Sequence, residues 1–177
     1  MKVQDIMSRE PATCGPEDSL NRASEIMWNR DVGCLPVVDD TSCLRAMITD
    51  RDVCMAAYTQ GRRLVDLSVS VAMSGEVRAC RPDDAVEVAE QTMLEHQVRR
   101  LPVIDEHRHV VGVLSISDIV RACARGLPAG RSGLRSDYVV RTLGAVCAPR
   151  VCGIEDVPTG AASSQAPKLE LLAGAHA

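Results

Sequence analysis

The chain has 177 residues, of which 46% are hydrophobic and 25% are charged, as is ordinary for a globular protein of one compact domain or two small ones. Only 2% of the residues are aromatic and the net charge is −4, which argues against a nucleic-acid-binding protein. No stretch is apolar enough for a membrane helix, and no signal peptide is evident. The eight cysteines are therefore expected to be reduced thiols in a cytoplasmic protein, and their spacing predicts no metal site.

The chain contains an internal repeat. Residues 3–56 align without a gap to residues 69–122, and sixteen of the 54 aligned pairs are identical. Among the identical pairs are the Leu-Pro-Val segments that begin at Leu35 and Leu101. A gapless match of this length indicates duplication of one structural unit.

The first copy begins with a predicted helix near 17–29, because proline and acidic residues before it suit the free amides of a first helical turn. Apolar residues then follow at helical spacing. A short strand over 35–38 and a second strand over 44–48, separated by a polar turn, form a predicted hairpin. A second helix is expected to begin at Thr49 and to continue to about residue 58.

The second copy repeats this order, with helices near 83–95 and 117–125 around another predicted hairpin. We therefore predict a mixed α/β (α+β) fold of two βαββα units, residues 1–62 and 63–126, packed about a pseudo-twofold axis. Residues 127–177 form a C-terminal extension outside the repeat. A helix is predicted over 134–146, and the tail is expected to be disordered because it is rich in Gly, Ala, Ser and Pro.

The same polar motif follows the second strand of both hairpins. Thr49 and Ser115 each precede a carboxylate by three residues, in Thr-Asp-Arg-Asp52 and Ser-Ile-Ser-Asp118. One interpretation is a capping box, in which hydroxyl and carboxylate satisfy the first amides of the helix. The other is a nucleotide site, because a helix N-terminus attracts phosphate and a carboxylate can accept hydrogen bonds from both ribose hydroxyls.

With these motifs, residues 1 to about 126 resemble a tandem cystathionine-β-synthase-type (CBS) domain pair, the Bateman module. The resemblance rests on Val3-x-Asp-Ile-Met-Ser8, on the Leu-Pro-Val segments and on the two motifs that end at Asp52 and Asp118. It implies that an adenosyl ligand, either AMP, ADP, ATP or S-adenosylmethionine, binds in clefts between the two units. No other cofactor is expected.

The resemblance also implies which residues contact that ligand. It assigns the ribose to Asp52 and Asp118. Phosphate contacts fall to the hydroxyl groups of the two motifs, which are Thr49, Ser115 and Ser117, and Arg51 is a further candidate for the ligand site. The base would lie against the main chain at Thr13, Cys14, Ala79 and Cys80.

The two copies differ in ways that predict unequal sites. Arg99 and Arg100 stand where the first copy has Gly33 and Cys34, and guanidinium groups hold phosphate well, so phosphate affinity should differ. Gly112 is replaced by an alanine in the first copy. Because glycine permits close approach of a ligand or of another chain segment, the first site is expected to be tighter.

We therefore expect a stand-alone regulatory module that senses an energy or metabolite signal and acts in trans on an unknown partner protein. The alternative is a dimerisation scaffold that keeps the fold without responding to a ligand. An enzyme is not expected, because no nucleophile–base arrangement, Walker loop or dinucleotide fingerprint is present. A homodimer with an isologous interface is expected through the four helices near 17–29, 50–58, 83–95 and 117–125.

Overall fold

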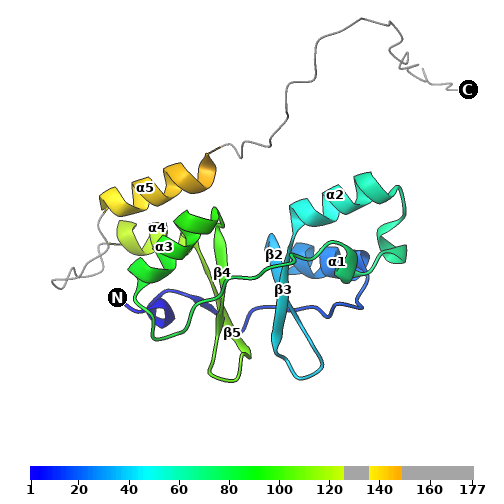
Figure 1. Cartoon of the computed structure of the whole chain (residues 1–177), viewed down its shortest axis with the longest axis horizontal. Helices are drawn as coiled ribbons and strands as arrows, with labels where there is room; N and C mark the ends of the chain where they lie inside the picture. Colours follow the sequence, from blue (N-terminus) through cyan, green and yellow to red (C-terminus); the bar gives the residue numbers. More distant parts are fainter. Residues whose placement is uncertain (126–135, 149–177) are drawn as a thin grey trace, which may run out of the picture.

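The computed structural model describes residues 1–125 and 136–148; the predicted disordered tail and the link over residues 126–135 lie outside these ranges. Two similar halves lie side by side, with a β-hairpin from each half at the centre and the helices beyond the hairpins (Figure 1). The predicted mixed α/β fold of two repeated units is confirmed.

The first half is built from two helices and one hairpin. Helix α1 (Leu20–Arg30) begins at Ser19, whose hydroxyl accepts a hydrogen bond from the Arg22 amide at 3.1 Å. Strands β2 (Cys34–Val38) and β3 (Leu44–Thr49) pair antiparallel. Helix α2 (Asp50–Gln60) follows and ends at Gly61, which adopts a left-handed conformation with φ of 59°.

The second half repeats this order. Helix α3 (Val86–His96) is followed by the antiparallel strands β4 (Arg100–Ile104) and β5 (Val110–Ser115), and then by α4 (Ile116–Ala124). The two hairpins have the same register. Leu35 faces Ile48 in the first hairpin, and Leu101 faces Leu114 at the equivalent position of the second. The duplication therefore extends to the pairing of individual residues.

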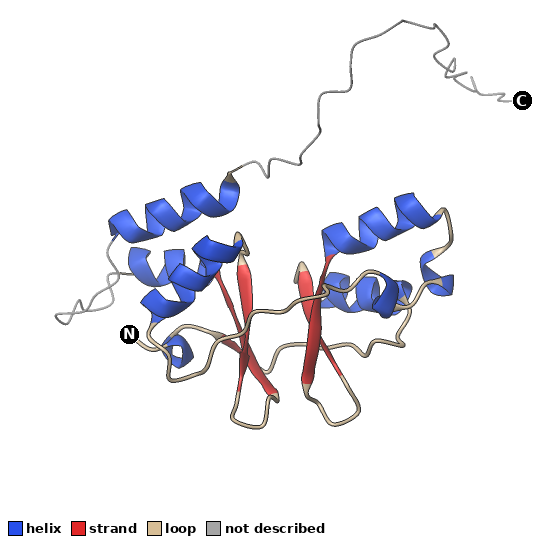
Figure 2. Ribbon diagram, in the orientation of Figure 1, coloured by secondary structure: helices blue, strands red, loops and turns tan. Residues whose placement is uncertain are grey.

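The two halves exchange their first segments. The 3-10 helix η1 (Val3–Asp5) and strand β1 (Ser8–Arg9) pack on the second half, where β1 pairs with β5. Reciprocally, η2 (Leu64–Asp66) and η3 (Val69–Val71) lie on the first half. The buried side chains Val3 and Val69 occupy equivalent places in the two hydrophobic cores. Each connecting segment therefore runs across the boundary between the halves (Figure 2).

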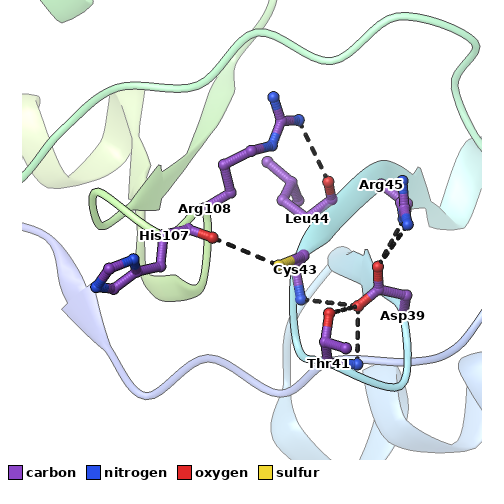
Figure 3. A network of polar contacts seen from close by, with 7 residues as sticks. All are labelled: Asp39, Thr41, Cys43, Leu44, Arg45, His107 and Arg108. Carbon is purple, nitrogen blue, oxygen red and sulfur yellow. Dashed lines mark hydrogen bonds and ion pairs between the residues drawn. The ribbon is translucent and has the colours of Figure 1, made fainter.

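The tips of the two hairpins also contact each other (Figure 3). The Leu44 amide donates to the Arg108 carbonyl at 3.0 Å, and the Cys43 thiol donates to the His107 carbonyl at 3.4 Å. Inside the first tip, the carboxylate of Asp39 accepts a hydrogen bond from the Thr41 hydroxyl, which is the main cause that lowers the pKa of Asp39 to about 2. These bonds join the halves at one end of the pseudo-twofold arrangement.

One further helix has no counterpart in the repeat. Helix α5 (Ser136–Cys147) falls where the extension is predicted to be helical, and it packs over α3 and α4 (Figure 1). Its buried Val139 joins the core of the second half. Over the first half, by contrast, Trp28 and Tyr58 remain 87% and 83% exposed. None of the described helices is both long and apolar enough to cross a membrane.

Candidate functional site

Both strand-to-helix motifs form a capping box. The amide and hydroxyl of Thr49 donate to one oxygen of Asp52 at 2.9 and 2.6 Å, and the Asp52 amide donates to the Thr49 hydroxyl at 3.3 Å. Ser115 and Asp118 repeat these bonds at 2.8, 2.6 and 3.2 Å. Each box uses only Oδ2 of its carboxylate, so the capping interpretation does not exclude a ligand at the other oxygen, Oδ1.

The Oδ1 atoms of the two carboxylates have different surroundings. Asp118 is 7% exposed, and its Oδ1 accepts a hydrogen bond from Arg121, one turn further along α4. Asp52 is partly exposed, and its Oδ1 has no hydrogen-bond donor within the described part of the chain. A ligand hydroxyl at Asp118 would therefore have to share or replace the Arg121 contact.

A cavity of about 620 Å³ lies beside Asp118, between the two halves. This volume is within the range of small-molecule sites. The segments 8–13 and 30–34 supply the walls from the first part of the chain, and the starts of β4 and α4 supply the rest. Four of the residues predicted for the ligand line this cavity: Thr13, Arg100, Ser115 and Asp118.

The cavity wall is rich in arginine. Four arginines from β1, α1, β4 and α4 line it, and they are Arg9, Arg30, Arg100 and Arg121. The lining also includes three carboxylates, those of Glu10, Asp31 and Asp118. Sequence reasoning missed three of the arginines, because they belong to no motif and are brought together only when the halves pack. In the repeat alignment, none of these arginines is matched by another arginine or a lysine. Their counterparts in the other copy are, in the same order, Gly75, His96, Cys34 and Met55. The structure thus makes the two potential sites unequal in charge.

The two residues at the start of β4 have different positions. Arg100 lies next to Gly33 of the first half, where a Cβ atom would stand 3.2 Å from the guanidinium and 3.0 Å from a carboxylate oxygen of Asp50. The glycine therefore leaves room for this pair of charges. Arg99 is exposed and does not line the cavity, and the same holds for Ser117.

The segments predicted to contact the base run beside the strands. The backbone of Cys14 bonds to β2 and that of Cys80 bonds to β4, whereas Thr13 and Ala79 make no backbone hydrogen bond to the described residues. Burial raises the pKa of both thiols to about 12, so both cysteines are neutral.

The residues predicted for the first-copy site are less closely gathered. Thr49 and Asp52 bond to each other, while Arg51 is exposed at the surface of α2. The Ser74 hydroxyl accepts a hydrogen bond from the Met47 amide at 3.0 Å, which holds the segment before Ala79 along β3. Among the described residues, no single set of contacts connects Thr49, Arg51, Asp52 and Ala79.

Gly112 is required by the protein's own backbone. A Cβ at this position would lie 2.6 Å from the Met7 sulfur and 2.9 Å from the Ser8 carbonyl oxygen. Gly112 therefore allows β1 to approach β5 closely, and this packing explains the glycine without any contribution from a ligand. The alanine at the corresponding position, Ala46, is buried in the first half.

The described residues do not gather a metal site. Nowhere in residues 1–125 or 136–148 do three or more His, Cys, Asp or Glu side chains lie close enough to hold an ion. In the second hairpin turn, His109 pairs with Asp105 at 3.2 Å.

Comparison with known proteins assigns the two repeats to one family. The model of the CBS domain matches residues 3–58 and 67–125. A CBS domain-containing protein, YhcV of Bacillus subtilis, is 36% identical over 117 residues, which cover 66% of this chain and 81% of the relative. Hypoxic response protein 1 of Mycobacterium tuberculosis is 32% identical over 152 residues, with coverage of 83% and 94%.

Larger proteins match over a small part of their length. Homoserine O-acetyltransferase of Methanococcoides burtonii is 29% identical over 119 residues, which are 67% of this chain but only 23% of that enzyme. The similarity is therefore confined to the CBS portion of the enzyme.

Solved structures of CBS domain pairs share the fold. The pair of protein MJ0100, in complex with 5′-methylthioadenosine and S-adenosyl-L-methionine, has a TM-score of 0.65 and 26% identity, and covers 71% of this chain and 97% of that one. CBSX2 of Arabidopsis thaliana in complex with AMP has a TM-score of 0.62 and 27% identity, with coverage of 70% and 96%. The chain therefore belongs to the CBS domain family and consists of a tandem pair of CBS domains followed by an additional helix.

Proposed function

We propose that this chain is a regulatory module that binds an adenosyl ligand and acts in trans as an energy or metabolite sensor. The observation that carries the proposal is the cavity of about 620 Å³, because it brings a helix start, the buried carboxylate of Asp118 and four arginines together between the halves. A carboxylate beside cationic groups is suited to a ligand that carries both ribose hydroxyls and phosphate.

Each wall of the cavity has a role in this proposal. Asp118 accepts the ribose hydroxyls through Oδ1 when Arg121 turns away from it toward phosphate. Ser115 and the first turn of α4 face the α-phosphate, as expected for a helix N-terminus. The main chain at Thr13 lies along the base.

We further propose that this site prefers ligands with more than one phosphate. Arg9, Arg30 and Arg100 provide cationic groups beyond the helix start, and a longer phosphate chain would reach more of them. ADP and ATP are therefore the favoured ligands at the Asp118 site. AMP and S-adenosylmethionine remain the alternatives, since solved pairs of similar fold are described with them.

A second site follows from the pseudo-twofold arrangement. It would use Asp52 for the ribose and Thr49 for phosphate, with the main chain of Ala79 and Cys80 beside the base. Arg51 and Arg99 are its exposed cations. Because it has fewer arginines than the Asp118 site, we propose that it binds polyphosphate more weakly.

The regulatory role is favoured over catalysis. The relative YhcV is named for its CBS domains and matches over 81% of its length, whereas in the enzyme that matches, the CBS portion is 23% of the chain. A scaffold without ligand response is the competing function. The intact Asp52 and Asp118, and the cavity beside the latter, count against it.

A thermal-shift screen tests the proposal. AMP, ADP, ATP and S-adenosylmethionine are each added to the purified chain, and the melting temperature is compared with that in buffer. A ligand at 100 times its dissociation constant stabilises the native state by about 2.7 kcal/mol, which raises the melting temperature by several degrees. If none of the four ligands changes the melting temperature, the scaffold interpretation replaces the sensor.

A further inference from the structure

A buried acid lies under the additional helix. Both carboxyl oxygens of Glu90 on α3 and the hydroxyl of Thr142 on α5 are buried side-chain oxygens without a hydrogen-bond partner in the described structure. Both residues are 0% exposed. An unpaired carboxylate in such a place is strongly disfavoured, so the environment selects the neutral acid.

Helix α5 packs on α3, the helix that carries Glu90, and on α4. In the first half, the residue aligned with Glu90 is Ser24 on α1, and none of the described helices covers α1 and α2 as α5 covers α3 and α4 (Figure 1). Ser24 is partly exposed and lines an open groove of about 380 Å³ together with Met27 and Trp28. The comparison of the two halves shows that the repeat alone does not bury this position.

The charged groups around Glu90 do not favour its ionised form. Burial, and then the charge of Glu87 on the same helix, raise the pKa of Glu90 to about 7. On α4, burial and then the charge of Glu90 raise the pKa of the Cys123 thiol. On α5, Thr142 is uncharged and the guanidinium of Arg141 belongs to an exposed residue.

We propose that α5 is a pH-dependent cover, which docks on α3 and α4 while Glu90 is neutral and is released when Glu90 ionises. Release would expose the α3–α4 helix face, in the way that the α1–α2 face is already exposed. The titrating group and its cover belong to the same chain, so the switch needs no second protein.

The direction of the pH effect follows from proton linkage. With α5 away, Glu90 titrates near its ordinary pKa of 4.5, and with α5 docked near 7. Between these values the docked state holds the additional proton, so docking is strongest below pH 4.5 and weakens as the pH rises to about 7. The two pKa values predict an opening equilibrium about tenfold larger at pH 8 than at pH 6, with most of the change complete near pH 7.

Amide hydrogen exchange of the full chain measures this equilibrium. Exchange rates of residues 136–147 are recorded at pH 6 and pH 8, and each is divided by the rate of the unfolded chain at the same pH. The protection of α5 should fall about tenfold between the two values. Helix α1, which carries Ser24 instead of the acid, is the internal reference, and its protection should not change.

Two substitutions identify the group. Glu90→Gln keeps the shape but cannot ionise, so α5 should stay equally protected at both pH values. Glu90→Ser, which copies the residue of the first half, should also abolish the pH dependence and serves if the Gln variant does not fold. The matched control Glu95→Gln, which removes an exposed acid of α3 that does not contribute to the raised pKa of Glu90, should retain it. Equal protection of wild-type α5 at both pH values, or an unchanged tenfold fall in the Glu90 variants, would overturn the proposal.

Discussion

Asp52 and Asp118 occupy the same position in the two CBS domains, yet their carboxylates differ in what surrounds them. Both hold a capping box through Oδ2, but only Asp118 also pairs with an arginine and faces an arginine-lined cavity. The motif therefore has a structural role in both domains. The differences beyond the motif support a stronger phosphate site at Asp118.

Substitution of an arginine from outside the motif tests this assignment. Arg30→Gln removes a cation from the cavity wall without touching the capping box. A hydrogen bond to a charged group contributes about 1.5–3 kcal/mol, so ATP affinity should fall about ten- to a hundredfold while adenosine affinity stays nearly constant. Isothermal titration measures both ligands. Arg63→Gln, which removes an exposed cation that pairs with Asp66, is the matched control and should leave both affinities unchanged.

At the residue scale, some of the residues that line the cavity can be predicted from the sequence and others cannot. Ser115, Asp118 and Arg100 could be predicted, because they lie within or beside a repeated motif. Arg9 and Arg30 could not be predicted, because their distance from Asp118 depends on how β1 and α1 pack relative to α4. The sequence correctly indicates a close approach at Gly112, but the segment that approaches it is β1 with the preceding Met7.

At the scale of elements, the exchanged segments join the two domains. Strand β1 crosses to the second half and pairs with β5, while the segment after α2 completes the core of the first half. Separating the halves would therefore remove buried side chains from both cores. The cavity depends on this exchange, because the connection that follows β1 forms one of its walls.

Gly112→Ala tests the docking of β1. The new methyl group would overlap the Met7 sulfur and the Ser8 carbonyl, and overpacking of this kind lowers stability by about 1–3 kcal/mol. Chemical denaturation should show this loss in the free energy of unfolding. Gly75→Ala is the control, because a Cβ there meets no atom within 4 Å. Equal stability of both variants would show that β1 is not held closely against β5.

The elements themselves were largely predictable, whereas their partners were not. Hydrophobic spacing and the repeat indicate the helices and hairpins, and the family resemblance provides their assembly. The two-residue strand β1 is too short to give a strand pattern, and the sequence of α5 does not show on which helices it packs. Those features depend on tertiary contacts between distant segments.

At the scale of the whole molecule, the uneven distribution of apolar surface bears on assembly. The predicted dimer interface used the helices of both halves, but α5 covers α3 and α4 in the described structure. The α1–α2 face remains open, with Trp28 and Tyr58 exposed. We therefore propose a homodimer through α1 and α2 alone.

A double substitution, Trp28→Ser with Tyr58→Ser, tests this interface. It removes the two most exposed large side chains of the α1–α2 face, so a dimer held there should dissociate. Light scattering should give twice the chain mass of 19.0 kDa for the wild type and a single chain mass for the variant. Val88→Ser, at an exposed apolar position on α3 in the second half, should leave the mass of the wild type unchanged. A wild-type mass of one chain would contradict the proposed dimer.

The most direct test of the sensor proposal is isothermal titration of ATP and ADP into the wild type and into Asp118→Asn and Asp52→Asn. The loss of a charge-assisted acceptor for the ribose should lower affinity about ten- to a hundredfold in Asp118→Asn and less in Asp52→Asn. Both variants should also melt slightly lower, because a weakened helix cap costs about 0.5–1 kcal/mol. If both variants bind these nucleotides as the wild type does and differ only in melting temperature, the carboxylates are helix caps alone and the account of the ligand site is wrong.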